Sequence, residues 1–291
     1  METQFRYDLN STVIGSGSNG ASQLFNGTLD EIAIYNRTLS ASEIATHAWG
    51  HYNNYQFGDG AISFVTETDN QTLDCAGKTL KGSGGGIGIN IPIDADGDNS
   101  GNHTILNCNL DWFNQGINSN SRDLTVKNSI IKNSVAENMA VGVSDVNPSY
   151  IVYLENITLT NSSTEDNIQA NANGLTNVTI INMNASYSEK TCATIDAPYI
   201  KIINSYFYNS STDHCVSLSG TKTSKSFFVN NKVKYNYKDD KFALYVSGTG
   251  QLLIENNTIE ENNLNFVSVG TDFIFRNNTL NTTYELNYAG T

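Results

Sequence analysis

The chain has 291 residues, of which 38% are hydrophobic, and a formal net charge of −13 at pH 7. Its length accommodates one large domain or two ordinary ones. The chain has only 16 Lys and Arg residues but 29 Asp and Glu residues. Clustered positive charge for nucleic-acid phosphates is therefore missing, and we expect no nucleic-acid partner. No apolar run approaches the roughly 18 residues that cross a bilayer, so we expect no membrane span in this chain.

The sequence of the first fifty residues predicts a strand followed by a short helix. Residues 24–45 read LFNGTLDEIAIYNRTLSASEIA, in which Ser40 and Glu43 form a helix-capping signature. The string resembles the closing segment of laminin-G-like, concanavalin-A-type jelly-roll modules. The resemblance implies that residues 1–50 are the C-terminal fragment of such a β-sandwich, with residues 51–60 as a linker or cap. Because the last strands alone would leave uncovered edges, we expect the chain to belong to a longer polypeptide or assembly.

From about residue 100 a short phrase ending in Asn returns every 21 to 28 residues, which is the length of one solenoid coil. Stacked coils place equivalent residues about 4.8 Å apart, so each Asn can bond to its copies above and below while tolerating a left-handed bend. The predicted ladder comprises Asn107, Asn128, Asn156, Asn182, Asn204, Asn230, Asn256 and Asn277.

This repeat resembles the right-handed parallel β-helix proteins of the pectate-lyase-like type, especially Asn-rich surface-protein repeats. The phrase LDCAGKTLKG, residues 73–82, is similar to the first coil of that group. The resemblance covers residues 61–291. We therefore predict an all-β protein, a right-handed parallel β-helix solenoid with an N-terminal partial β-sandwich segment.

The four cysteines fall in two pairs along this repeat. Cys192 and Cys215 align one 23-residue coil apart, and neighbouring parallel strands bring Cα atoms within disulfide range. Cys75 and Cys108 are also about one coil apart, although their alignment slips by one residue. We predict both disulfides, with four buried thiols as the alternative. Paired cysteines favour an extracellular or cell-surface location, as do thirteen Asn-x-Ser/Thr sequons.

An acidic insertion offers oxygen ligands for a hard cation. Asp94, Asp96, Asp98 and Asn99 surround a mid-loop glycine, a pattern that suits Ca²⁺, although no Glu stands at the twelfth position of an EF-hand. We expect this loop to bind Ca²⁺. A solvated acidic turn is the alternative.

Enzyme chemistry has one candidate pair. Asp213 and His214 lie in the phrase STDHCVSL, which is similar to the G-D-D-C phrase of polygalacturonases, but His214 replaces the second Asp. One carboxylate cannot serve as both acid and base, so we expect a turn without a catalytic role.

Exposed aromatic rings offer a second kind of site. Phe207 should point inward and push Tyr206 and Tyr208 outward, one coil from Tyr235 and Tyr237. Such rings can stack on sugar faces, although edge packing between coils is the alternative. We expect an extracellular or cell-surface structural or adhesion module that contacts glycans or cell-surface components without cleaving them. The alternative is a polysaccharide lyase or glycoside hydrolase, which fold analogy alone favours.

Overall fold

The computed structural model describes residues 54–56, 60–64, 69–92, 101–142, 150–171, 175–220, 225–236, 242–248, 250–260, 263–267, 273–281 and 286–289. The backbone divides into two compact units, Met1–Ala48 and Trp49–Thr291. The predicted sandwich fragment, residues 1–50, lies outside the described residues. All described secondary structure is β-strand, and none of it is a helix that could cross a membrane.

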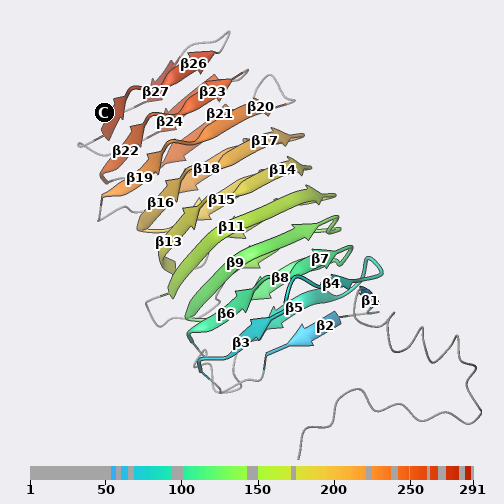
Figure 1. The fold of residues 1–291 in the computed structure, drawn as a ribbon. Coiled ribbons are helices and arrows are strands. Elements are labelled where there is room, and N and C mark those ends of the chain that lie inside the picture. The colour runs from blue at the N-terminus through green and yellow to red at the C-terminus, as the bar shows by residue number, and fades with distance from the viewer. Residues whose placement is uncertain are drawn as a thin grey trace, which may run out of the picture. The chain divides into compact units, whose positions relative to one another are not determined.

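The second unit is a parallel β-solenoid, in which successive coils stack on one another (Figure 1). One side of the coils is a ten-stranded parallel sheet in which strands from successive coils pair in sequence order. Its strands are β2 (Gly60–Ser63), β5 (Ile87–Ile91), β8 (Gln115–Ser119), β10 (Met139–Val141), β12 (Ile168–Ala170), β15 (Ala193–Asp196), β18 (Val216–Ser219), β21 (Phe242–Ser247), β24 (Asn263–Val267) and β27 (Leu286–Ala289).

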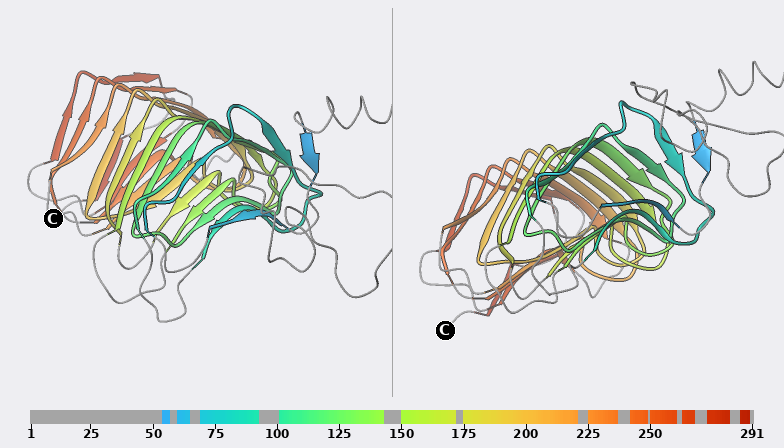
Figure 2. Two further views of the ribbon diagram at one scale, coloured as in Figure 1. Left: turned by 60° about the horizontal axis from the view of Figure 1, so that its bottom comes forward. Right: turned by 90° about the horizontal axis from the view of Figure 1, so that it is seen from below.

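The remaining strands form a seventeen-stranded sheet that is folded along a bend, so that it covers two sides of the coils (Figure 2). Strands before the bend are β3 (Thr72–Asp74), β6 (His103–Leu106), β13 (Leu175–Ile181), β16 (Tyr199–Ile203), β19 (Ser226–Val229), β22 (Leu252–Glu255) and β25 (Phe273–Arg276). Strands after it are β4 (Thr79–Lys81), β7 (Asn109–Asp111), β14 (Asn184–Ser188), β17 (Tyr206–Ser210), β20 (Lys232–Asn236), β23 (Thr258–Glu260) and β26 (Thr279–Asn281). Two long strands, β9 (Asp123–Lys132) and β11 (Tyr150–Ser162), run through the bend.

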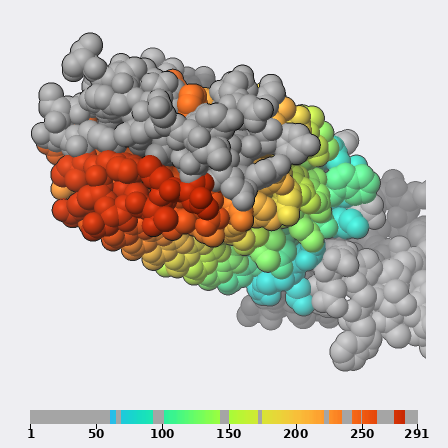
Figure 3. All heavy atoms as spheres, turned by 90° about the horizontal axis from the view of Figure 1, so that it is seen from above, coloured from blue at the N-terminus to red at the C-terminus, as the bar shows by residue number. Residues whose placement is uncertain are grey.

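Apolar side chains stack in columns inside the coils because successive strands pair in register. In the ten-stranded sheet, Ile117 is paired with Met139, Met139 with Ile168, and Ile168 with Ala193. All four are fully buried. Burial of one such aliphatic side chain contributes about 1.5–3 kcal/mol, so the repeated columns, more than any single residue, hold the fold together. Figure 3 shows the coils from outside as successive bands of colour.

The structure confirms the predicted all-β class and the parallel solenoid. It also adds a strand where a linker or cap was predicted over residues 51–60. Asn54–Gln56 forms β1, which pairs with β4 through Asn54 and Thr79. Part of the predicted linker is therefore integrated into the seventeen-stranded sheet.

Candidate functional site

The eight predicted ladder asparagines all lie at the bend of the folded sheet. Their φ angles lie between 52° and 56°, in the left-handed region. Amide groups bond from coil to coil: Asn128 Nδ2 donates to Asn107 Oδ1 at 3.4 Å, Asn156 to Asn128 at 2.9 Å, and Asn182 to Asn156 at 3.0 Å. Asp74 ends the series by accepting from Asn107 at 3.0 Å. Asn suits this position because it tolerates positive φ better than other side chains and bonds to its own copy.

A second polar column, which sequence reasoning missed, lies one residue further along and points into the coil. Asn231 and Asn257 are buried there. The backbone N of Asn231 donates to Asn257 Oδ1 at 2.7 Å, and Asn257 Nδ2 donates to the Phe228 carbonyl at 2.8 Å. Side chains at this column therefore satisfy backbone groups that the bend leaves unpaired. The Asn-Asn doublets at 230–231, 256–257 and 277–278 were the available signal.

The chain makes a second bend where the strands of the seventeen-stranded sheet that follow the Asn ladder end. Its described positions also have positive φ, from 54° to 67°. They are Trp112, Asn133, Asn161, Tyr187 and Asn209. Asn161 Nδ2 donates to Asn133 Oδ1 at 2.9 Å, so amides are linked across coils here too. Large rings are unfavourable at positive φ, which makes Trp112 and Tyr187 exceptions.

The predicted rings Tyr206 and Tyr208 lie on the outer face of β17, and Phe207 between them is fully buried. The rings of Tyr206 and Tyr208 stack with centroids 5.1 Å apart. Tyr187, which the sequence did not single out, meets Tyr208 edge-on at 4.9 Å and is 47% exposed. Burial, followed by a hydrogen bond with Tyr187, raises the pKa of Tyr208 to about 12. The phenol is therefore neutral at physiological pH.

The other two predicted rings are only partly covered by the structure. Tyr235 belongs to β20, which pairs with β17, but its side chain lies outside the described residues, as does all of Tyr237. Described neighbours on β20 include Lys232, whose ammonium lies 6.0 Å from the Tyr206 ring centroid and 3.1 Å from Glu260 Oε1. Lys234, which pairs with Tyr208, lies 3.6 Å from Glu260 Oε2. The Lys232 hydrogen bond lowers the pKa of Glu260. Lys232 and Lys234 thus form ion pairs with Glu260 beside the tyrosines.

A groove of about 250 Å³ opens beside Tyr187 at the second bend. Hydroxyls, amides and one carboxylate line it. The lining residues are Asn161, Ser162, Ser163, Tyr187, Ser188, Glu189, Asn209 and Ser211. Three successive coils contribute to this surface, so the groove exists only once those coils are stacked. Its combination of a flat exposed ring with hydrogen-bonding groups can hold a sugar ring.

The candidate catalytic pair has local structural partners. Asp213 Oδ1 accepts a bond from the backbone N of His214 at 2.8 Å and lies 3.6 Å from His214 Nε2. His214 Nδ1 accepts from the backbone N of Phe242 at 3.1 Å, and its ring stacks on Tyr245 at 4.5 Å. The imidazole lone pair is therefore engaged with the backbone. These contacts are those of a turn that is packed against the next coil.

The sequence analysis did not single out Asp166, a buried carboxylate that bonds to the next coil. Its side chain accepts a bond from the backbone N of Thr191 at 2.9 Å, and the residue is 6% exposed. Burial raises the pKa of Asp166, partly offset by bonds from Thr194 and Thr191. The described residues contain no cluster of three or more His, Cys, Asp or Glu that could hold a metal ion. The predicted Ca²⁺ ligands Asp94, Asp96, Asp98 and Asn99 lie outside the described residues.

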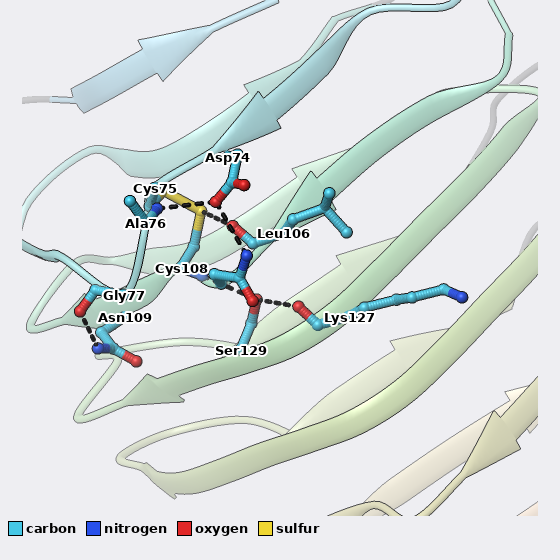
Figure 4. Close-up of a disulfide and its surroundings, with 10 residues drawn as sticks. Asp74, Cys75, Ala76, Gly77, Leu106, Cys108, Asn109, Lys127 and Ser129 are labelled. Carbon is cyan, nitrogen blue, oxygen red and sulfur yellow. Dashed lines mark hydrogen bonds between the residues drawn. A yellow bond between two sulfur atoms is a disulfide. The ribbon is translucent and has the colours of Figure 1, made fainter.

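The two cysteine pairs differ in bonding. Cys75 and Cys108 form a disulfide, with Cα atoms 4.8 Å apart (Figure 4). The one-residue slip between them is absorbed by the turn: four residues, 75–78, separate β3 from β4, whereas two separate β6 from β7. Cys192 and Cys215 are buried free thiols whose sulfurs lie 2.7 Å apart. The predicted second bond is thus absent from the structure, although its two partners are adjacent.

Together, the fold and these sites define a disulfide-containing parallel β-solenoid protein with Asn-lined bends and a polar groove beside Tyr187. No protein-family model, curated protein or solved structure matches the chain.

Proposed function

We propose that this protein is a non-catalytic extracellular or cell-surface scaffold that binds neutral glycans in the Tyr187 groove. One observation carries the proposal. Tyr187 is 47% exposed at a positive φ of 54° and borders a groove of about 250 Å³ that Asn161 and Asn209 also line. A bulky ring in this strained conformation persists only where the surrounding structure holds it, and such sites are often functional.

The chemistry of the groove suits an uncharged sugar. The exposed ring provides an apolar surface for the C–H face of a pyranose, and the amides and hydroxyls can donate to and accept from its hydroxyl groups. Tyr208, whose pKa burial raises to about 12, is a neutral phenol that packs edge-on against Tyr187. Among the described residues that line the groove, Glu189 is the charged one. Together with the net charge of −13, it would repel polyuronates.

The extracellular location is supported by covalent chemistry. The Cys75–Cys108 disulfide is stable in oxidising compartments, and thirteen sequons provide acceptor sites for glycosylation. A laminin-G-like segment over residues 1–50 and a Ca²⁺ loop around Asp96 would fit such a surface protein. The resemblance to pectate-lyase-like β-helices fits the same architecture. We propose these features on the sequence patterns described above.

Binding can be tested with a glycan array followed by calorimetry on the oligosaccharides that are retained. The full chain should be made in a host without N-glycosylation, because Asn161 and Asn209 are themselves sequon residues. We expect Tyr187→Ala to weaken binding at least tenfold. Trp112→Ala is the matched control, since Trp112 occupies the same bend, has positive φ and is also 47% exposed. Equal loss in both variants, or no retained glycan, would contradict the proposal.

Cleavage must be measured on the same samples. Incubation with pectins, alginates and neutral glycans in the presence of Ca²⁺ should yield neither unsaturated products nor new reducing ends. Turnover that Asp213→Ala abolishes would replace the scaffold by a polysaccharide-cleaving enzyme. Turnover that survives Asp213→Ala would also contradict the proposal, because it would require catalytic groups elsewhere in the chain.

A further inference from the structure

Cys192 and Cys215 occupy equivalent positions in neighbouring coils, one residue before β15 and β18. The register of these strands pairs Ala193 with Val216, and the backbone N of Ala193 donates to the Cys215 carbonyl at 3.0 Å. Both side chains are fully buried. Their sulfurs lie 2.7 Å apart, so the two side chains face each other between the neighbouring coils.

The same buried column carries cross-coil pairs along its length. Two coils earlier, Asn138 and Asn167 are fully buried and joined by a 2.6 Å bond from Asn138 Nδ2 to Asn167 Oδ1. Cys192 and Cys215 come next, and Ala243 follows them. Along this column, neighbouring coils are therefore in side-chain contact through the amides of Asn138 and Asn167 and, further toward the C-terminus, through the sulfurs of Cys192 and Cys215.

We propose that Cys192 and Cys215 are oxidised to a second cross-coil disulfide in the mature protein. Adjacent parallel strands hold Cα atoms about 4.8 Å apart, inside the roughly 4.4–6.8 Å that a disulfide accepts. The Cys75–Cys108 bond shows the same Cα separation, 4.8 Å, between coils of this chain. The sulfurs of Cys192 and Cys215 lie 2.7 Å apart, so the bond, about 2.05 Å long, needs only a small side-chain movement.

The oxidation requires an electron acceptor, and a disulfide of a small thiol compound or of an oxidoreductase serves. One cysteine thiolate attacks that disulfide and releases one thiol. The second thiolate then displaces the other half from the mixed disulfide, so two protons and two electrons leave the pair and the acceptor becomes two thiols. Thiolate is the reacting form. Burial raises the pKa of Cys215, so the reaction belongs to folding, before the next coil covers the pair.

Such a bond would staple the middle of the solenoid. Each coil of a solenoid contacts only its neighbours, and its stability is a sum of local terms. The Cys75–Cys108 bond links the coils of β3 and β6 near one end. A Cys192–Cys215 bond would link the coils of β15 and β18. Opening of the stack between these two coils would then be blocked covalently.

Thiol counting tests the proposal. The full chain, secreted through an oxidising compartment, is denatured in iodoacetamide without reductant, and its intact mass and peptide map are recorded. Denaturation is essential because native alkylation would miss buried thiols as well as bonded ones. We expect no carbamidomethyl group before reduction and four after it. Two groups that map to Cys192 and Cys215, or any pairing between the two sets of cysteines, would overturn the proposal.

A double variant, Cys192→Ala with Cys215→Ala, provides the control, since Ala243 already occupies the next position in the column. After reduction, this variant should carry two carbamidomethyl groups, one on Cys75 and one on Cys108. The wild-type count decides the question even if this variant fails to fold. Oxidation during folding is tested by adding oxidised glutathione to reduced chains. Chains refolding in its presence should form the second bond at least tenfold faster than chains already folded, and equal rates would refute that order of events.

Discussion

Replacement of Asn128 tests whether the Asn bend stabilises the solenoid through its backbone or through its amides. Asn128 has a φ of 52°. Its side chain donates to Asn107 at 3.4 Å and accepts from Asn156 at 2.9 Å. Asn128 is also free of the complication of glycosylation, because Asn128-Ser-Ile is not a sequon. The residue therefore separates the two contributions cleanly.

Two substitutions of Asn128 separate the backbone contribution from the side-chain contribution to stability. Asn128→Ala removes both side-chain bonds, at about 0.5 kcal/mol each for exposed groups, and places a Cβ without a compensating amide at positive φ, which costs about 1 kcal/mol more. We expect a loss of about 2 kcal/mol in the free energy of unfolding. Asn128→Gly removes the same bonds but relieves the Cβ strain, so its loss should be about half as large.

Thermal unfolding followed by circular dichroism measures the difference. At about 2–4 °C per kcal/mol for a domain of this size, Asn128→Ala should lower Tm by about 4–8 °C. Asn128→Gly should lower it by about 2–4 °C. Equal losses in the two variants would show that the left-handed backbone conformation contributes nothing. A loss below 1 °C in both would refute the stabilising role of the ladder at this coil.

Three further predictions concern packing and burial. Gly116→Ala should lower the free energy of unfolding in urea by about 3 kcal/mol, because the new Cβ would lie 2.1 Å from Ile131 Cγ2. Gly142→Ala is the control: nothing lies within 4 Å of its new Cβ, so its stability should change by less than about 0.5 kcal/mol. Similar losses in the two variants would contradict the packing argument. Burial raises the pKa of Asp166, so the folded state binds its proton more tightly than the unfolded state and stability falls as pH rises through and above the ordinary carboxyl pKa. The Tm of the wild type should therefore fall more, or rise less, between pH 4 and pH 7 than that of Asp166→Asn, and parallel pH profiles would count against a buried carboxylate. Phe207→Ala should cost about 3–5 kcal/mol in the same unfolding assay because the ring is fully buried, and a loss below about 1 kcal/mol would mean that this ring is not part of the core.

The sequence by itself determined the class and the period of this fold. Positive φ at a bend is a local requirement that Asn meets within its own residue, and alternation of apolar residues on either side is a local property of strands. Both signals recur with every coil, from Asn107 to Asn277. A solenoid repeats one local rule, and a short pattern was enough to predict it.

Tertiary structure decided which side chains meet, because neighbours in a solenoid are one coil apart and coil lengths vary. Tyr187 joins Tyr208 and Asn161 only through the register of β11, β14 and β17. The two extra residues in the 75–78 turn bring Cys75 to Cys108 despite their slipped alignment. Asp166 reads as an ordinary turn acid in the sequence, and its raised pKa comes from the coils that bury it. Registers depend on the length of every intervening loop, which local propensities do not specify.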